Sequence, residues 1–213
     1  MRVLVACEEL QRVCIAFREK GFDAYSCDLR DCSGGHPEWH IKDDCLRVMT
    51  EDYFDLVIAH PPCTRLCVSG QRWYYTDDLE YNQRKRQEQK EAIDFFMKIV
   101  RYADCGNLLA IENPIGIMSK LYRRPDQIYN PCDFAFETEA KRTCLWLFNG
   151  LQPLDHTQYL QREFRTHNIH SGYNGKKYLP YSSDEMSVFR SKTPVGVARA
   201  MAEQWGAYLE RGY

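Results

Sequence analysis

The sequence lacks any long apolar run. Of its 213 residues 44% are hydrophobic, yet no stretch approaches the roughly 20 consecutive apolar residues that a membrane-spanning helix needs. Residues 1–7 have the pattern of a buried strand and contain no signal-peptide cleavage site. These absences argue against a membrane or secreted protein. We expect a cytoplasmic protein with no membrane partner.

The sequence also lacks a strong excess of charge of either sign. It has 28 Lys and Arg against 30 Asp and Glu, which gives a formal net charge of −2. A chain with this balance has no overall attraction to a polyanion, so any contact with nucleic acid must come from a local basic patch. The net charge neither supports nor excludes DNA as a partner.

Cysteine is abundant, with ten residues, but the features that accompany a disulfide scaffold are missing. A chain of this length can bury a core without cross-links, and no secretion signal precedes the cysteines, so we expect free thiols. Cys27, Cys32, His36 and His40 are of metal-binding types. However, only three residues separate the middle two, far fewer than the segment between the ligand pairs of a zinc finger. We predict no metal site.

Short apolar runs alternate with amphipathic stretches, a pattern that is typical of βαβ units and a parallel sheet. Strands are expected at residues 2–6, 22–28, 54–59, 108–111 and 143–148, and helices at 10–20, 80–102 and 194–209. No linker, repeat or low-complexity tract divides the chain. We predict a single catalytic domain over residues 1–213, with an α/β, Rossmann-like fold whose mostly parallel sheet is flanked by helices.

Three of the predicted strands end in reactive or acidic groups: Asp28, Cys63 and Glu112. In open parallel sheets, ligands bind outside the carboxyl ends of the strands. Cys63 follows Pro61 and Pro62, so a stiff turn is expected to hold its sulfur at the edge of the sheet, where a thiol can act as a nucleophile. Glu112 is suited to donate a proton. The simpler alternatives are a packed cysteine and a surface carboxylate.

Two motifs carry a resemblance to a known family. Pro61-Pro62-Cys63 and Glu112-Asn113-Pro114 each follow an apolar strand, and they resemble the Pro-Cys and Glu-Asn catalytic motifs of DNA cytosine-C5 methyltransferases in order and context. The resemblance implies a class I methyltransferase fold and S-adenosylmethionine as cofactor. It also implies methyl transfer to cytosine C5 in DNA through a covalent intermediate at Cys63. Glu112 becomes the acid partner, and Lys141 the cation that orients the base.

The resemblance extends to the cofactor side of the fold. It places the cofactor against Cys7, Glu8, Asp28, Asp44 and Pro61. Among these, Asp28 resembles the acid that binds the ribose, and Asp44 lies in a loop that resembles the one contacting the adenine. The chain departs from the family in residues 7–12, where Cys-Glu-Glu-Leu-Gln-Arg replaces the usual glycines.

On the substrate side, the resemblance implies roles for Asn113, Arg142, Lys176 and Lys177. Residues 150–190 take the place of the family's target-recognition domain, and we expect them to form a reduced recognition insertion. Their basic and aromatic side chains suit phosphates and stacked bases, although a solvated loop is the alternative. A protein partner is one source of the missing sequence specificity.

Two other functions stay open on the sequence alone. The same cysteine chemistry can act on a free pyrimidine nucleotide or on a single strand, which need no recognition domain. A non-catalytic binder of nucleotides or nucleic acid with this fold is the second alternative, although such a protein needs neither Cys63 nor Glu112.

Overall fold

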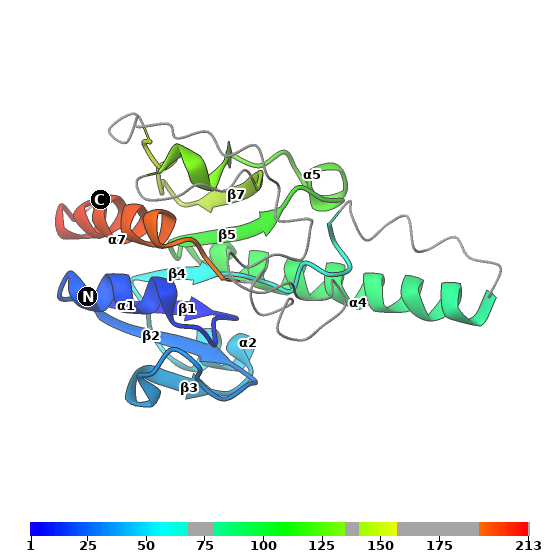
Figure 1. The fold of residues 1–213 in the computed structure, drawn as a ribbon, viewed down its shortest axis with the longest axis horizontal. Helices are drawn as coiled ribbons and strands as arrows, with labels where there is room; N and C mark the ends of the chain where they lie inside the picture. Colours follow the sequence, from blue (N-terminus) through cyan, green and yellow to red (C-terminus); the bar gives the residue numbers. More distant parts are fainter. Residues whose placement is uncertain (68–78, 135–140, 157–191, 213) are drawn as a thin grey trace, which may run out of the picture.

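The computed structural model describes residues 1–67, 79–134, 141–156 and 192–212. These residues form an α/β fold in which helices cover both faces of a seven-stranded mixed sheet (Figure 1). The strands are β1 (Arg2–Ala6), β2 (Asp23–Asp28), β3 (His40–Lys42), β4 (Leu56–Ala59), β5 (Leu109–Pro114), β6 (Gln127–Tyr129) and β7 (Thr143–Phe148). The α-helices are α1 (Arg12–Glu19), α2 (Cys45–Glu51), α4 (Leu79–Tyr102), α5 (Met118–Leu121) and α7 (Val195–Glu210). Short 3₁₀ turns lie at Pro37–Trp39, Ala103–Cys105 and Pro131–Asp133.

The strand order is β3-β2-β1-β4-β5-β7-β6. Strands β1 to β5 run parallel, whereas β7 is antiparallel to both of its neighbours, β5 and β6. The chain moves outward from β1 to β3 and then returns to place β4 on the other side of β1. This change of direction is the topological switch point of the sheet, and in doubly wound sheets ligands bind outside the carboxyl ends of the strands at such a point, which here are β1 and β4.

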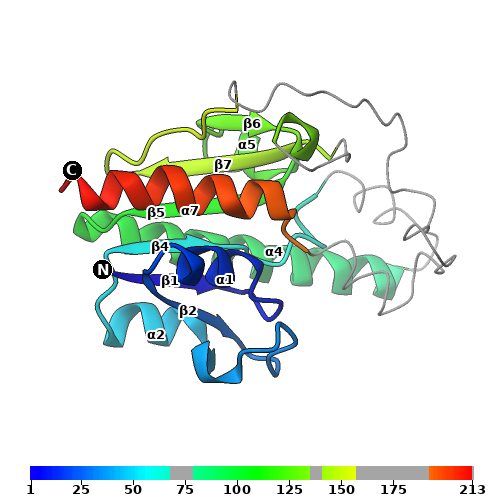
Figure 2. The same ribbon diagram turned by 60° about the vertical axis from the view of Figure 1, so that its left-hand side comes forward.

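The two faces of the sheet bury separate hydrophobic cores. Because side chains alternate along a strand, Val3 and Val5 of β1 pack with helices α1 and α7, whereas Leu4 and Ala6 pack with α2 and α4. Figure 2 shows α1 and α7 side by side on the near face, with α4 behind the sheet. The central strands are therefore buried on both sides, which explains why their sequences are continuous apolar runs and do not alternate.

The prediction of an α/β fold with a mostly parallel sheet flanked by helices is confirmed. Most long elements lie within a few residues of their predicted bounds. One boundary was wrong in a way that concerns the site. The sequence places Glu112 just after a strand that ends at Ile111, but β5 continues to Pro114 because β7 pairs with it as far as Pro114↔Thr143. The short elements β3, α2, α5 and β6 were not predicted.

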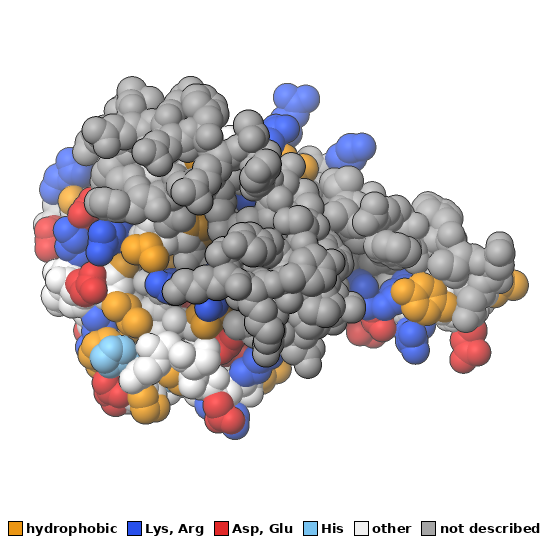
Figure 3. Space-filling view, viewed as in Figure 1, with side chains coloured by type: hydrophobic (Ala, Val, Ile, Leu, Met, Phe, Trp, Pro, Cys, Tyr) orange, Lys and Arg blue, Asp and Glu red, His pale blue; other side chains and the backbone are white. Residues whose placement is uncertain are grey.

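The described surface agrees with a nearly balanced charge. In Figure 3, basic and acidic side chains are interspersed over the described part of the face in view. All ten cysteines are free thiols, as expected. None of the helices in the described ranges combines the length and the apolar character needed to span a bilayer.

Trp205 of α7 provides a test of how this helix is held to the fold. Its ring is almost fully buried in the core that α1 and α7 share, and its Nε1 donates to the carbonyl oxygen of Gln152 at 2.9 Å. We predict that Trp205→Ala lowers the free energy of unfolding by about 3–5 kcal/mol, as for other large buried aromatic side chains. Urea denaturation followed by circular dichroism measures this.

Trp205→Phe is the matched variant, because it keeps most of the ring and removes the donor to Gln152. It should cost less than Trp205→Ala, about 1–3 kcal/mol for the unpaired carbonyl. Equal losses for the two variants would contradict the packing role of the ring.

Candidate active site

Residues from three segments of the chain lie at the carboxyl edge of the sheet, around the switch point. Cys7 and Glu8 follow β1, residues 60–63 follow β4, and Glu112 lies near the end of β5. The backbone N–H of His60 donates to the carbonyl oxygen of Ala6 at 2.9 Å, so the pairing of β1 with β4 extends one residue past β4. The sheet thus brings together side chains that lie far apart in the sequence.

The loop that carries Cys63 is tied to β5 by a side-chain hydrogen bond. Nδ2 of Asn113, a residue only 2% exposed, donates to the carbonyl oxygen of Pro61 at 2.7 Å. After the prolines the chain turns, and the N–H groups of Leu66 and Cys67 both donate to the carbonyl oxygen of Cys63 at 2.9 Å. Cys63 is therefore held at the edge of the sheet, half-buried, as the sequence predicts.

A second tie joins the same turn to the segment after β5. Cys67 forms an isolated bridge with Gly116, and the N–H of Ile117 donates to the carbonyl oxygen of Leu66 at 2.9 Å. A Cβ on Gly116 would lie only 2.1 Å from the Leu66 carbonyl oxygen. The close approach of these two backbones therefore requires glycine.

The surroundings of Cys63 act in opposite directions on its thiol. A hydrogen bond with Cys67, burial and the charge of Glu112 raise the pKa of Cys63 well above the usual range, whereas the positive charge of Lys141 lowers it. Lys141 lies just before β7, and β7 is the strand next to β5, which carries Glu112. In this state the protein favours the thiol over the thiolate, and Lys141 supplies the opposing charge.

Glu112 is largely buried and has partners on two elements. Its Oε2 lies 3.3 Å from Nδ1 of His60, and its side chain also hydrogen-bonds to Tyr129 of β6. Burial raises the pKa of Tyr129 well above the usual range, and the charge of Glu112 adds to this. Cys63 and Glu112 are close enough for their charges to interact, as their positions at neighbouring strand ends predict.

His60 is the site residue that the sequence analysis missed. Burial alone disfavours its charged form, but the hydrogen bond and charge of Glu112, together with the charge of Glu8, outweigh burial and raise its pKa. Its Nε2 atom is buried and has no hydrogen-bond partner among the described residues. A polar residue directly after a fully buried strand was the available signal.

Glu8 does not have the open position that we expected for a cofactor ligand. Its side chain, 6% exposed, accepts hydrogen bonds from the N–H groups of Val13 at 2.7 Å and Cys14 at 3.1 Å. These are the free donors at the start of α1. Burial raises the pKa of Glu8, while His60 and the backbone donors lower it. The carboxylate thus fills the anion-binding end of α1.

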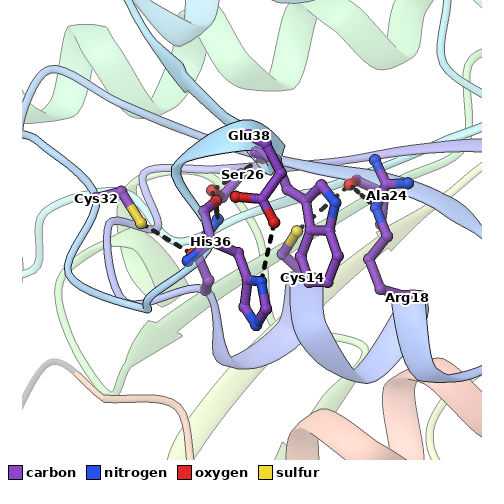
Figure 4. A network of polar contacts seen from close by, with 9 residues as sticks. Cys14, Arg18, Ala24, Ser26, Cys32, His36 and Glu38 are labelled. Carbon is purple, nitrogen blue, oxygen red and sulfur yellow. Dashed lines mark hydrogen bonds and ion pairs between the residues drawn. The ribbon is translucent and has the colours of Figure 1, made fainter.

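Gln11 closes the loop that follows β1. Its backbone is left-handed at φ 55°, and its buried amide donates to Ser26 Oγ at 3.1 Å and to the His36 carbonyl oxygen at 2.8 Å. Its Oε1 accepts from Cys32 Sγ at 2.9 Å and from the N–H of His36 at 3.0 Å. Figure 4 shows three of the residues in this network, Ser26, Cys32 and His36, close to one another. The segment between β2 and β3 is thereby fastened over the first loop.

The four residues with metal-like types have separate partners. Cys32 bonds to Gln11, and Cys27 Sγ donates to the Asp43 carbonyl oxygen at 3.4 Å. His36 pairs with Glu38, and His40 Nδ1 lies 2.9 Å from Ser26 Oγ. No group of three or more metal-binding side chains gathers within the described ranges.

The remaining predicted residues lie at different places around this edge. Asp28, at the end of β2, accepts a hydrogen bond from the N–H of Arg30 at 3.0 Å, and Cys7 Sγ lies 3.7 Å from Cys45 Sγ. Asp44 is exposed and caps α2 by accepting from the N–H of Leu46 at 2.9 Å. Arg142 is exposed just before β7. Lys176 and Lys177 lie outside the described residues.

Gly116 offers a test of the turn that positions Cys63. Gly116→Ala should separate the Leu66 and Gly116 backbones and cost about 1–3 kcal/mol of stability, as overpacking usually does. The rate at which iodoacetamide alkylates Cys63 should change with it, because the turn that holds the sulfur is displaced. Thermal melting and peptide mapping after alkylation measure the two effects.

Gly35→Ala is the control, since a Cβ there would meet nothing within 4 Å although the φ of +95° carries backbone strain. It should leave the alkylation rate of Cys63 unchanged. An unchanged rate in Gly116→Ala as well would show that the turn does not depend on this contact.

No family model and no curated protein sequence matches this chain. The resemblance of its two motifs to cytosine-C5 methyltransferases therefore stays a prediction. The function has to be inferred from the residues that the sheet brings together, above all Cys63, Glu112 and Lys141.

Proposed function

We propose that the protein transfers a methyl group from S-adenosylmethionine to C5 of cytosine in DNA through a covalent intermediate at Cys63. The observation that carries the proposal is the pairing of the two motifs in space. Asn113, which follows Glu112, donates to the carbonyl of Pro61, two residues before Cys63. A nucleophile and an acid are thus fixed to each other across neighbouring strands, which is the arrangement that a planar pyrimidine ring needs.

The proposal includes a class I methyltransferase fold. This fold is supported by the parallel strands β1 to β5, by the switch point between β1 and β4, and by the antiparallel strand β7 inserted between β5 and β6. An inserted antiparallel strand distinguishes this order from the doubly wound dinucleotide-binding sheet, in which the sixth strand follows the fifth directly.

The residues at the carboxyl ends of β1 and β2 fit a cationic adenosine cofactor better than a dinucleotide. Because the Glu8 carboxylate already accepts from the N–H groups at the start of α1, a pyrophosphate at that place would meet a buried acid. A sulfonium cation suits such a place. Asp28 would hold the ribose hydroxyls and Asp44 the adenine, and Leu29, 73% exposed beside Asp28, offers apolar surface to a flat ring.

The chain's own residues account for the steps at the pyrimidine. The Cys63 thiol first loses its proton to water, and Lys141 stabilises the resulting thiolate and orients the base. The thiolate attacks C6 and forms an S–C6 bond, while the displaced electron pair moves toward N3, which takes a proton from Glu112. A bound cofactor would supply the methyl group that C5 takes up. Loss of the C5 proton to water then restores the C5–C6 double bond and expels Cys63 as the thiolate, and N3 returns its proton to Glu112.

A cytosine in duplex DNA would have to be flipped out of the stack to reach Cys63. The segment expected to contribute recognition, residues 150–190, is described only up to residue 156. A protein partner that supplies sequence specificity is part of the proposal. A free pyrimidine nucleotide or a single strand remains the alternative substrate, and a non-catalytic binder the alternative function.

Calorimetry tests the cofactor. We predict that the protein binds S-adenosylmethionine and its demethylated product, and that Asp28→Ala weakens both at least about tenfold, because a hydrogen bond to a charged group contributes roughly 1.5–3 kcal/mol. Asp31→Ala is the control, since Asp31 lies on the same loop but pairs with Lys42. No binding of either compound at millimolar concentration would remove this cofactor from the proposal.

Covalent trapping tests the reaction. We predict that 5-fluorocytosine in the substrate forms a lasting adduct with Cys63 when S-adenosylmethionine is added, because fluorine at C5 cannot leave as a proton. Intact-protein mass spectrometry detects the adduct. Cys63→Ala should abolish it, Cys67→Ala should retain it, and Glu112→Gln should slow it by about 100-fold to 10,000-fold.

The substrate is offered in three forms: a duplex oligonucleotide with randomised flanks, the single strand, and the free nucleotide. The proposal requires the adduct with the duplex, whereas an adduct with only one of the others identifies the alternative substrate. An adduct that is lost in Cys67→Ala but kept in Cys63→Ala would mean that the nucleophile is Cys67. No adduct with any form would contradict the cysteine mechanism.

A further inference from the structure

The charges of two acidic side chains, Glu112 of β5 and Glu8 of the loop after β1, act on His60. Its Nδ1 is 3.3 Å from Glu112 Oε2 on β5, and the charge of Glu8, from the loop after β1, also acts on the ring. The side chains of His60 and Glu112 are 11% and 17% exposed. None of the steps proposed for Cys63, Glu112 and Lys141 uses this histidine.

The chemistry proposed for Glu112 leaves one requirement open, which is the source of its proton at neutral pH. Glu112 can protonate N3 of a pyrimidine only in its carboxylic acid form, because a carboxylate has no proton to give. A neighbouring group that retains a proton at neutral pH removes this difficulty, and an imidazole in contact with the carboxylate is such a group.

We infer that His60 is a proton-relay residue, which stores a proton beside Glu112 and passes it to Glu112 for delivery to N3 of the pyrimidine. The inference rests on the proposed function and deepens it. Transfer of the Nδ1 proton from the imidazolium of His60 to the carboxylate of Glu112 gives a neutral imidazole and a carboxylic acid. The acid protonates N3 as the S–C6 bond forms. When that bond breaks, the proton returns to Glu112 and then to His60, so the pair ends the cycle with its proton restored, while the proton lost from C5 leaves separately to water.

The charges that face His60 favour the storage of a proton on its ring. Glu112 and Glu8 both favour the imidazolium, and together they outweigh burial, so the pKa of His60 is raised. Lys141, from the segment before β7, acts in the opposite direction. Tyr129 of β6 faces Glu112 and stays neutral, because burial raises its pKa. The two acids, Glu8 and Glu112, therefore favour the charged form of the ring, and the single cation, Lys141, disfavours it.

The other ring nitrogen, Nε2, is buried and has no hydrogen-bond partner among the residues that the structure describes. Buried polar atoms without partners are rare and costly in folded proteins. In the imidazolium Nε2 carries a proton, so a ring that stores a proton here needs an acceptor at Nε2 that the described residues do not supply.

The pH dependence of trapping distinguishes a relay from a packing role. In wild type, the reaction needs Cys63 ionised and His60 protonated, so the single-turnover rate of adduct formation should rise with pH and level off where His60 loses its proton. In His60→Asn, which keeps a donor near Glu112 but cannot be protonated, this levelling-off should move to lower pH. The rate should therefore be reduced at least about tenfold at pH 7.5 and much less at pH 5.5. Rates measured by quenched mass spectrometry from pH 5.5 to 8.5 provide the comparison.

His36→Asn is the matched control, because His36 is more exposed and pairs with Glu38. Its profile should follow that of wild type. If His60→Asn lowers the rate by the same factor at every pH, the histidine only holds the structure and the inference is wrong, while the proposed function stands. If wild type forms no adduct at all, the proposed function fails instead.

A titration that needs no substrate tests the pair directly. The ring resonances of His60, assigned by their absence in His60→Asn, should titrate by NMR with a pKa above the usual histidine value. Glu112→Gln and Glu8→Gln should each lower that pKa, because each removes a negative charge that favours the imidazolium. A ring that does not titrate between pH 5 and 9, or that ignores Glu112→Gln, would overturn the relay whatever the protein's activity.

Discussion

The hydrogen bond from the Asn113 side chain to the Pro61 carbonyl oxygen, 2.7 Å long, holds the two halves of the site together. The ladder between β4 and β5 ends at Ala59↔Ile111. Beyond it, Pro61 and Pro62 have no N–H to continue the pairing. A side chain has to supply the donor, and its amide is too buried to bond to water instead. Losing this bond would leave a buried polar group unpaired, at a cost of about 1–3 kcal/mol.

The charges behind this bond form one connected arrangement. Glu8, His60 and Glu112 come from the ends of β1, β4 and β5, three adjacent strands, and Lys141 acts on both His60 and Cys63. In a site of low dielectric constant, each of these groups sets the protonation of the next. The raised pKa of Cys63 and the raised pKa of His60 therefore have related causes, since the charge of Glu112 contributes to both.

The sequence was sufficient for those features that depend on local pattern. Continuous apolar runs predicted the buried strands, and the residues at their ends predicted where Cys63 and Glu112 meet. Features that depend on contacts between distant segments were not accessible. The extension of β5 to Pro114 requires the pairing with β7, and β3 is too short to show a period. The partners of Glu8 and His60 lie on other elements. Neither the helix-capping role of Glu8 nor the contact of His60 with Glu112 could therefore be predicted.

The loop after β1, which departs most from the methyltransferase pattern that the two motifs resemble, is also the one that completes the charge arrangement. Glycines normally let such a loop approach a cofactor, whereas here Cys7 and Gln11 adopt left-handed backbone at φ 61° and 55°. Conformations of this kind cost about 1–3 kcal/mol each unless the surroundings hold them, and the four hydrogen bonds of the Gln11 amide do so. The loop fixed in this way positions Glu8 at the start of α1 and within electrostatic reach of His60. A flexible glycine loop would provide neither the carboxylate nor its fixed position. The altered loop and the histidine before Pro61 are therefore best understood as parts of one device, because the charge of each favours the ionised form of the other.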